Sequence, residues 1–207
     1  MNIFRVIYFF VIFFISVPVL ATRNYTVYPM TDLELSQLPP FCQVWGKRDF
    51  VATDMWVDKL HIPNIHHLCK GLNHANRVMS HSVSGQVYID NINHGIGEFS
   101  YVLKHSTDYN KPLMPFILVR RAKLYISRVN LGRKGEVNKS RDAAINDYKE
   151  AIKLNPKFER AYIDLIEVYA RMKDRVNMRT QLKQGLKNIP ESKILLKKQK
   201  KYNISIK

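Results

Sequence analysis

The sequence predicts an all-α protein built from antiparallel helices, and three observations lead to this fold class. From residue 65 onward, apolar residues recur three and four positions apart, as on one face of a helix. Short stretches rich in glycine, proline and polar residues separate these segments, so successive helices should be joined by short connections. No alternation of apolar and polar residues is long enough to indicate a β-strand.

The chain begins with the pattern of a secretory signal peptide. Arg5 provides positive charge, residues 6–20 are apolar, and residues 19–21 fit a small-x-small cleavage motif. We expect cleavage of residues 1–21 and export of the remainder to the periplasm or the cell exterior. An uncleaved membrane anchor is the alternative, although the apolar run is shorter than the roughly 20 residues that span a bilayer.

Residues 22–60 predict an irregular N-terminal arm. Three prolines interrupt helical periodicity there, namely Pro29, Pro39 and Pro40. One short turn of helix around residues 32–38 is the only regular structure expected. Apolar side chains within the arm indicate that it packs against the rest of the protein.

Periodic segments then follow one another to the end of the chain. Proline at positions 112 and 115 starts one helix, and proline at 156 and 190 ends two others. Longer polar connections are expected at residues 80–86 and 133–140. The predicted helices cover residues 65–79, 87–106, 114–132, 141–156, 158–174, 177–190 and 192–201.

Two of these helix pairs are similar to each other. Asn155-Pro156 and Ile189-Pro190 end them, and the two prolines lie 34 residues apart. Small residues such as Ala151 would let helices approach closely. With this spacing the chain resembles the tetratricopeptide repeat (TPR) family, and its order of segments is similar to small exported bacterial members of that family. The resemblance implies a short right-handed solenoid of antiparallel helix pairs.

That resemblance implies a division of the chain and a function. About three repeats, the first two degenerate, would occupy residues 61–190, and a basic capping helix and tail would occupy residues 191–207. Family members usually bind a peptide or partner protein on the concave surface, which the first helix of each pair lines. The repeat alignment places seven candidates on this surface: Asn76, Lys123, Ser127, Ile163, Glu167, Ala170 and Arg171.

Two features depart from the family pattern. Arg121 occupies a position where an apolar residue is expected. The lysine–asparagine clamp with which some members hold a C-terminal carboxylate is not recognisable. Capture of a free C-terminus is therefore not predicted.

Cys42 and Cys69 are the two cysteines of the chain. Export to an oxidising compartment favours a disulfide between them, worth about 3 kcal/mol through the loop that it closes. A metal site with nearby histidines such as His66 and His74 is the alternative, because zinc accepts these ligands. No CxxC, HxxxH or HExxH motif occurs, so we expect neither a metal nor a cofactor. Without a nucleophile motif or a P-loop, we also expect no catalysis.

The charge balance supports a second function. The chain has 33 basic and 17 acidic residues, a net charge of +16, and loss of Arg5 with the signal leaves +15. Lysines concentrate at residues 187–207. A basic envelope protein that binds an anionic polymer, polysaccharide or surface through this end is therefore the alternative to the peptide-binding scaffold. Export argues against nucleic acid as the partner.

Overall fold

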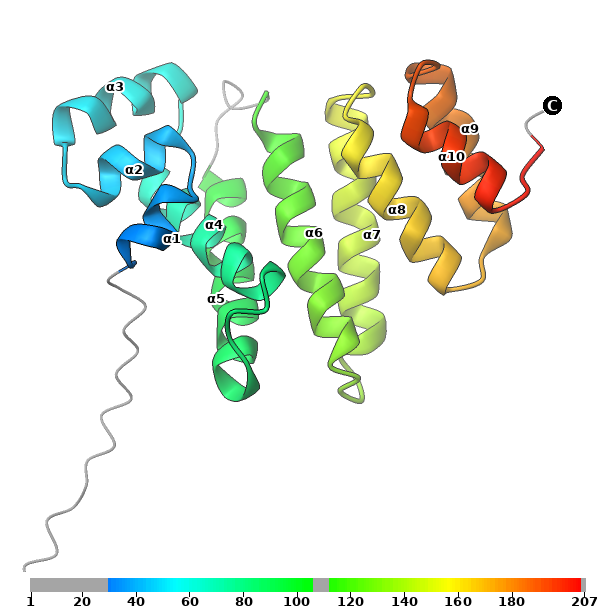
Figure 1. Ribbon diagram of the computed structural model, residues 1–207, viewed down its shortest axis with the longest axis horizontal. Helices are drawn as coiled ribbons and strands as arrows, with labels where there is room; N and C mark the ends of the chain where they lie inside the picture. Colours follow the sequence, from blue (N-terminus) through cyan, green and yellow to red (C-terminus); the bar gives the residue numbers. More distant parts are fainter. Residues whose placement is uncertain (1–29, 106–111, 206–207) are drawn as a thin grey trace, which may run out of the picture.

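The computed structural model describes residues 30–105 and 112–205, and these residues form ten α-helices without a strand (Figure 1). The all-α prediction is confirmed. From α4 to α10 the helices stand side by side in a row, with α1–α3 at one end and α9 and α10 at the other. The helices are α1 (Asp32–Ser36), α2 (Pro40–Gly46), α3 (Phe50–Leu60), α4 (Ile65–Met79), α5 (Gly85–His105), α6 (Met114–Asn130), α7 (Val137–Leu154), α8 (Glu159–Arg171), α9 (Arg175–Asn188) and α10 (Lys193–Lys201).

Consecutive helices pack in pairs, α4 with α5, α6 with α7 and α8 with α9, and neighbouring pairs meet through α5–α6 and α7–α8. The connection before α7 is shorter than predicted, because this helix begins at Val137. Its first turn carries exposed polar residues such as Asn138 and Lys139. Such turns have no apolar periodicity by which the sequence could reveal them.

The short turn of helix expected around residues 32–38 corresponds to α1. The expectation that the rest of the arm is irregular is wrong, because α2 and α3 also form there. Thr31 and Glu34 form a capping box at the start of α1. Pro40 is the first residue of α2, a position that favours proline because its backbone needs no N–H donor there. Asp49 caps α3 by accepting a hydrogen bond from the Ala52 amide at 3.0 Å. Pro40, which suggested an interruption in the sequence, therefore starts a helix.

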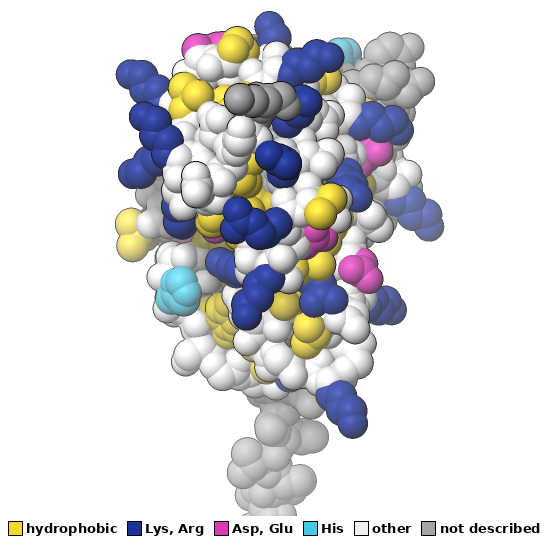
Figure 2. Space-filling view, turned by 90° about the vertical axis from the view of Figure 1, so that its right-hand side faces the viewer, with side chains coloured by type: hydrophobic (Ala, Val, Ile, Leu, Met, Phe, Trp, Pro, Cys, Tyr) yellow, Lys and Arg dark blue, Asp and Glu magenta, His cyan; other side chains and the backbone are white. Residues whose placement is uncertain are grey.

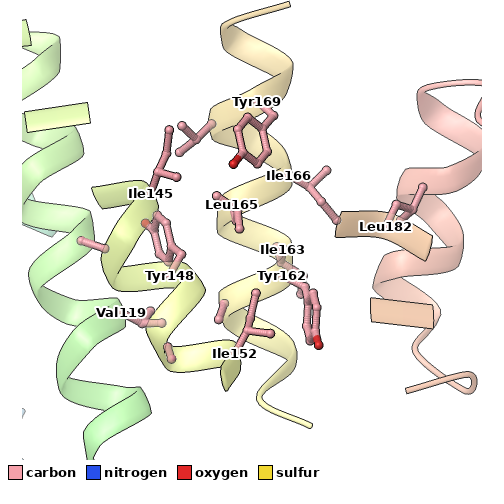
Figure 3. Close-up of a cluster of buried hydrophobic side chains, with 14 of the residues drawn as sticks. Val119, Ile145, Tyr148, Ile152, Tyr162, Ile163, Leu165, Ile166, Tyr169 and Leu182 are labelled. Carbon is pink, nitrogen blue, oxygen red and sulfur yellow. The ribbon is translucent and has the colours of Figure 1, made fainter. Parts of the chain in front are cut away.

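The core is continuous along the row because α6 contributes to two apolar clusters. Its residues Ile117 and Leu124 pack with α4 and α5, whereas Leu118 and Val119 pack with α7 and α8 (Figure 3). A Cβ atom on Gly71 would lie 2.9 Å from the Phe99 ring. The absence of a side chain at this position thus permits close approach of α4 and α5.

The disulfide prediction is confirmed. Cys42 of α2 and Cys69 of α4 are bonded, and both are fully buried. The bond joins the α1–α3 segment to the first helix pair. It is consistent with an oxidising location outside the cytoplasm.

The predicted signal peptide, residues 1–21, lies outside the described residues. Within residues 30–105 and 112–205, no helix combines the length and the apolar character that a membrane crossing requires.

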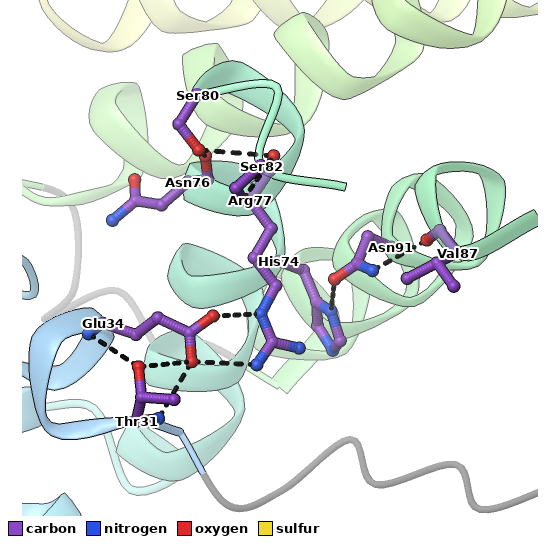
Figure 4. A network of polar contacts seen from close by, with 9 residues as sticks. All are labelled: Thr31, Glu34, His74, Asn76, Arg77, Ser80, Ser82, Val87 and Asn91. Atoms are coloured by element: carbon purple, nitrogen blue, oxygen red, sulfur yellow. Dashed lines mark hydrogen bonds and ion pairs between the residues drawn. The ribbon is translucent and has the colours of Figure 1, made fainter. Parts of the chain in front are cut away.

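An ion pair also fastens α1 to α4 (Figure 4). Two guanidinium nitrogens of Arg77, Nε and Nη2, donate to the Glu34 carboxylate, at 2.5 and 3.0 Å. The hydrogen bond from Arg77 is the largest cause that lowers the pKa of Glu34 from 4.5 to about 2. The charged carboxylate therefore stabilises the fold above pH 4.5, and this contribution disappears as the pH falls towards 2.

We expect Glu34→Gln to lower the free energy of unfolding at neutral pH by about 1 kcal/mol, a small value because solvent screens this partly exposed pair. The difference from wild type should shrink as the pH falls below 4.5. Urea denaturation across this pH range measures it, with Asp142→Asn, at an exposed position on α7, as the control. A difference that stays constant with pH would contradict the assignment.

Candidate functional site

Histidines of the histidine-rich helix α4 make packing contacts within the protein. His67 places Nδ1 2.5 Å from the Glu98 carboxylate and stacks on Tyr101 with 3.9 Å between ring centroids. Among the described residues no three histidine, cysteine, aspartate or glutamate side chains lie together as metal ligands. The metal alternative also required free thiols, and the Cys42–Cys69 bond removes them.

His74 is a buried packing residue (Figure 4). Its Nδ1 lies 2.8 Å from Oδ1 of Asn91, whose Nδ2 donates to the Val87 carbonyl. The Asn91 oxygen is thus the acceptor, and His74 carries its proton on Nδ1. Burial lowers the pKa of His74, so the ring is neutral at physiological pH.

An open groove of about 320 Å³ crosses the row from α4 to α8. Apolar side chains form part of its wall, and charged side chains from α6 and α8 together with neutral polar side chains form the rest. Along α8, the groove residues recur at positions 160, 164, 167 and 171, which share one helical face about 16 Å long. The lining residues are Val78, Met79, His81, Tyr88, Lys123, Ile126, Ser127, Asn130, Tyr148, Arg160, Asp164, Glu167, Val168 and Arg171.

Both carboxylates of the groove already have cationic partners. Asp164 accepts from Arg160 at 2.9 Å and lies 3.6 Å from the Lys123 ammonium. Glu167 pairs with Lys198 of α10 and accepts a hydrogen bond from the Tyr202 hydroxyl at 2.9 Å. Although partial burial by itself would raise the pKa of Glu167, these two partners lower it.

Cationic side chains in and near the groove outnumber these two carboxylates. Arg120 lies one helical turn before Lys123, and its guanidinium sits 5.3 Å from the centroid of the Phe116 ring. No described carboxylate pairs with Arg120 or with Arg171. Burial lowers the pKa of Arg120 and of Lys123, and the nearby charge of Arg160 acts in the same direction on both. An anion bound here would relieve this repulsion.

The chain matches no protein-family model, no curated protein and no solved structure.

The structure brings together four of the seven predicted groove residues, Lys123, Ser127, Glu167 and Arg171. Ile163 does not belong to the groove, because it is buried in the core between α8 and its neighbours (Figure 3). Ala170 packs against the same core, and Asn76 lies outside the groove lining at the C-terminal end of α4.

Sequence reasoning missed Arg160 and Asp164. The alignment assigned residues 163 and 170 to the groove. The predicted groove-facing side of α8 is therefore rotated about the helix axis from the observed side. A signal for the correct face existed in the sequence. Arg160, Asp164, Glu167 and Arg171 are charged residues three or four apart, on the side of the helix opposite its buried tyrosines.

Proposed function

We propose that this protein is an exported, TPR-like scaffold that binds an acidic peptide or protein segment in the groove, without catalysis. The observation that carries the proposal is the excess of cations around an open, partly apolar groove built from successive helix pairs. The regular row of pairs and the 34-residue spacing of Pro156 and Pro190 support a solenoid of this family. The disulfide supports export to the periplasm or the cell exterior.

The size of the groove fits a short extended segment. Its charged face on α8 is about 16 Å long, which corresponds to roughly five residues of extended chain. Apolar side chains such as Met79, Ile126 and Val168 would contact aliphatic side chains of the peptide. Arg171 lines the groove, and Arg120 lies one turn of α6 before the lining residue Lys123. These two arginines would pair with the carboxylates of the peptide, since neither has a described acidic partner.

A peptide of alternating glutamate and leucine, labelled for fluorescence anisotropy, tests this function. We expect Arg120→Gln/Arg171→Gln to weaken binding about tenfold or more, because two charge-assisted hydrogen bonds are lost. Both substitutions leave the Asp164 and Glu167 ion pairs intact.

The matched control is Lys139→Gln/Lys149→Gln, which removes the same charge from exposed positions on α7. It should bind the peptide like wild type. A peptide with glutamine in place of glutamate should bind weakly to all three proteins. Equal affinity of wild type for both peptides would reject an acidic partner in this groove. An equal loss of peptide affinity in both double variants would reject it as well.

A further inference from the structure

A second surface, at the C-terminal end of the row, carries many cations and almost no acid. Between residues 175 and 205 there are nine lysines and arginines and one carboxylate, Glu191. Figure 2 looks onto this end of the molecule and shows Lys and Arg side chains spread across it, with few acidic side chains. We call this surface the basic end face and define it by seven of the exposed cations on α9 and α10: Arg179, Lys183, Lys187, Lys193, Lys197, Lys200 and Lys201.

Helical geometry aligns these cations. Arg179, Lys183 and Lys187 follow one another at four-residue intervals, so they form a row along α9 with about 6 Å between neighbours. Lys193 and Lys197 begin a similar row on α10. The opposite sides of both helices are anchored in the protein, because residues such as Leu182 and Leu195 are fully buried. The cations therefore face outward together.

Contacts with α8 hold α10 in a fixed orientation. Lys198 and Tyr202 both bind the Glu167 carboxylate, and Ser192 donates to Glu159. The following segment is held too, because Arg179 donates from Nε and Nη2 to the Ser205 carbonyl at 3.1 and 2.9 Å. The basic end is thus a preformed surface that includes α9, not only the lysine-rich tail that the sequence suggested.

Exposed apolar side chains lie on the same two helices. Val176 is 76% exposed on α9, and Ile194 and Leu196 are 48% and 39% exposed on α10. Helical spacing places Val176 beside Arg179, Ile194 beside Lys197, and Leu196 beside Lys200. Aliphatic side chains among cations suit a layer with charged head groups above hydrocarbon, whereas a hydrated anionic polymer offers nothing apolar for them to contact.

We propose that the basic end face binds the surface of an anionic phospholipid bilayer. Its lysines and arginines would contact lipid phosphates, while Val176, Ile194 and Leu196 enter the head-group region. This site is separate from the groove, so the protein could hold a peptide while attached to a membrane. The interaction is peripheral and requires no membrane-crossing helix.

Cosedimentation of residues 22–207 with vesicles tests the proposal. We expect binding to vesicles of phosphatidylcholine mixed with an equal amount of phosphatidylglycerol, and little binding to phosphatidylcholine alone. Raising the salt from about 0.1 M to about 1 M should release most of the protein, because the Debye length falls from about 10 Å to about 3 Å.

Two sets of variants separate the face from net charge. Lys183→Glu/Lys197→Glu should weaken vesicle binding about a hundredfold, because each reversal replaces an attraction with a repulsion. Lys139→Glu/Lys149→Glu changes the net charge equally on α7 and should retain most of the binding. Val176→Ser/Ile194→Ser should reduce vesicle binding severalfold but leave binding to soluble dextran sulfate unchanged.

Specific outcomes would overturn the proposal. An equal loss of vesicle binding in the two lysine double variants would mean that net charge alone attracts the vesicles. Tight binding to dextran sulfate without binding to anionic vesicles would identify a polymer as the partner of the face. Peptide binding in the groove is measured on the same variants, and it should be unchanged, so the two sites are judged separately.

Discussion

Replacement of Cys42 and Cys69 by alanine is expected to lower the free energy of unfolding by about 3.5 kcal/mol. The two residues are 27 positions apart, and the crosslink restricts the unfolded chain by closing this loop. Both cysteines are fully buried, so alanine introduces no polar group into the core. Urea denaturation of the oxidised wild type and of the double variant measures the difference.

The loss of stability in the cysteine double variant should be concentrated at the N-terminal end. Besides the disulfide, the Glu34–Arg77 pair is a main polar link between the α1–α3 segment and α4. Hydrogen exchange in α1–α3 should therefore accelerate more than exchange in α8 and α9. Dithiothreitol should destabilise wild type and leave the double variant unchanged. Wild type that keeps its stability after complete reduction would contradict the expectation.

Arg121→Met is expected to lower the free energy of unfolding by about 3–5 kcal/mol, because it leaves a carboxylate unpaired in the interior. Arg121 donates from Nε and Nη2 to Asp147 at 2.8 and 2.7 Å, and from Nη1 to the Ser100 hydroxyl at 2.9 Å. Asp147 is only 6% exposed. The guanidinium thus links α5, α6 and α7, and methionine would fill similar space without the charge.

A double-mutant cycle gives the sharpest test of this pair. Arg121→Met/Asp147→Leu should be more stable than either single variant, because no charge then remains buried alone. Arg160→Met, which breaks the more exposed Arg160–Asp164 pair, is the control and should cost less than about 1 kcal/mol. If the losses of unfolding free energy in the two single variants add up to the loss in the double variant, the two side chains do not act together.

Arg121 also illustrates what the sequence could not explain. From the sequence alone, Arg121 is a charged residue at a position where an apolar one is expected. Nothing near it in the sequence identifies its partner, because Asp147 lies 26 residues away on another helix. The same holds for the groove, where Lys123 of α6 meets Asp164 of α8. Such pairs depend on how helices are arranged in space, and periodicity within one helix carries no information on them.

Local patterns determined most of the helices. Apolar spacing predicted α4, α5, α6, α8, α9 and α10 close to their observed bounds, because these helices bury one face along most of their length. It failed for the short helices α2 and α3, where a proline at a first position and the Asp49 cap set the boundaries. A proline taken alone is ambiguous, since it can end one helix or begin the next.

By itself, the sequence determined the all-α class, the order of the helix pairs, the pairing of the two cysteines and the basic C-terminal end. These features depend on residue types and on spacings within short segments. Only the tertiary structure decided which side of α8 lines the groove, which cations lack acidic partners, and that α9 and α10 share one basic face. Each of these depends on the rotation of a helix about its axis and on its distance from neighbours, and packing between helices sets both.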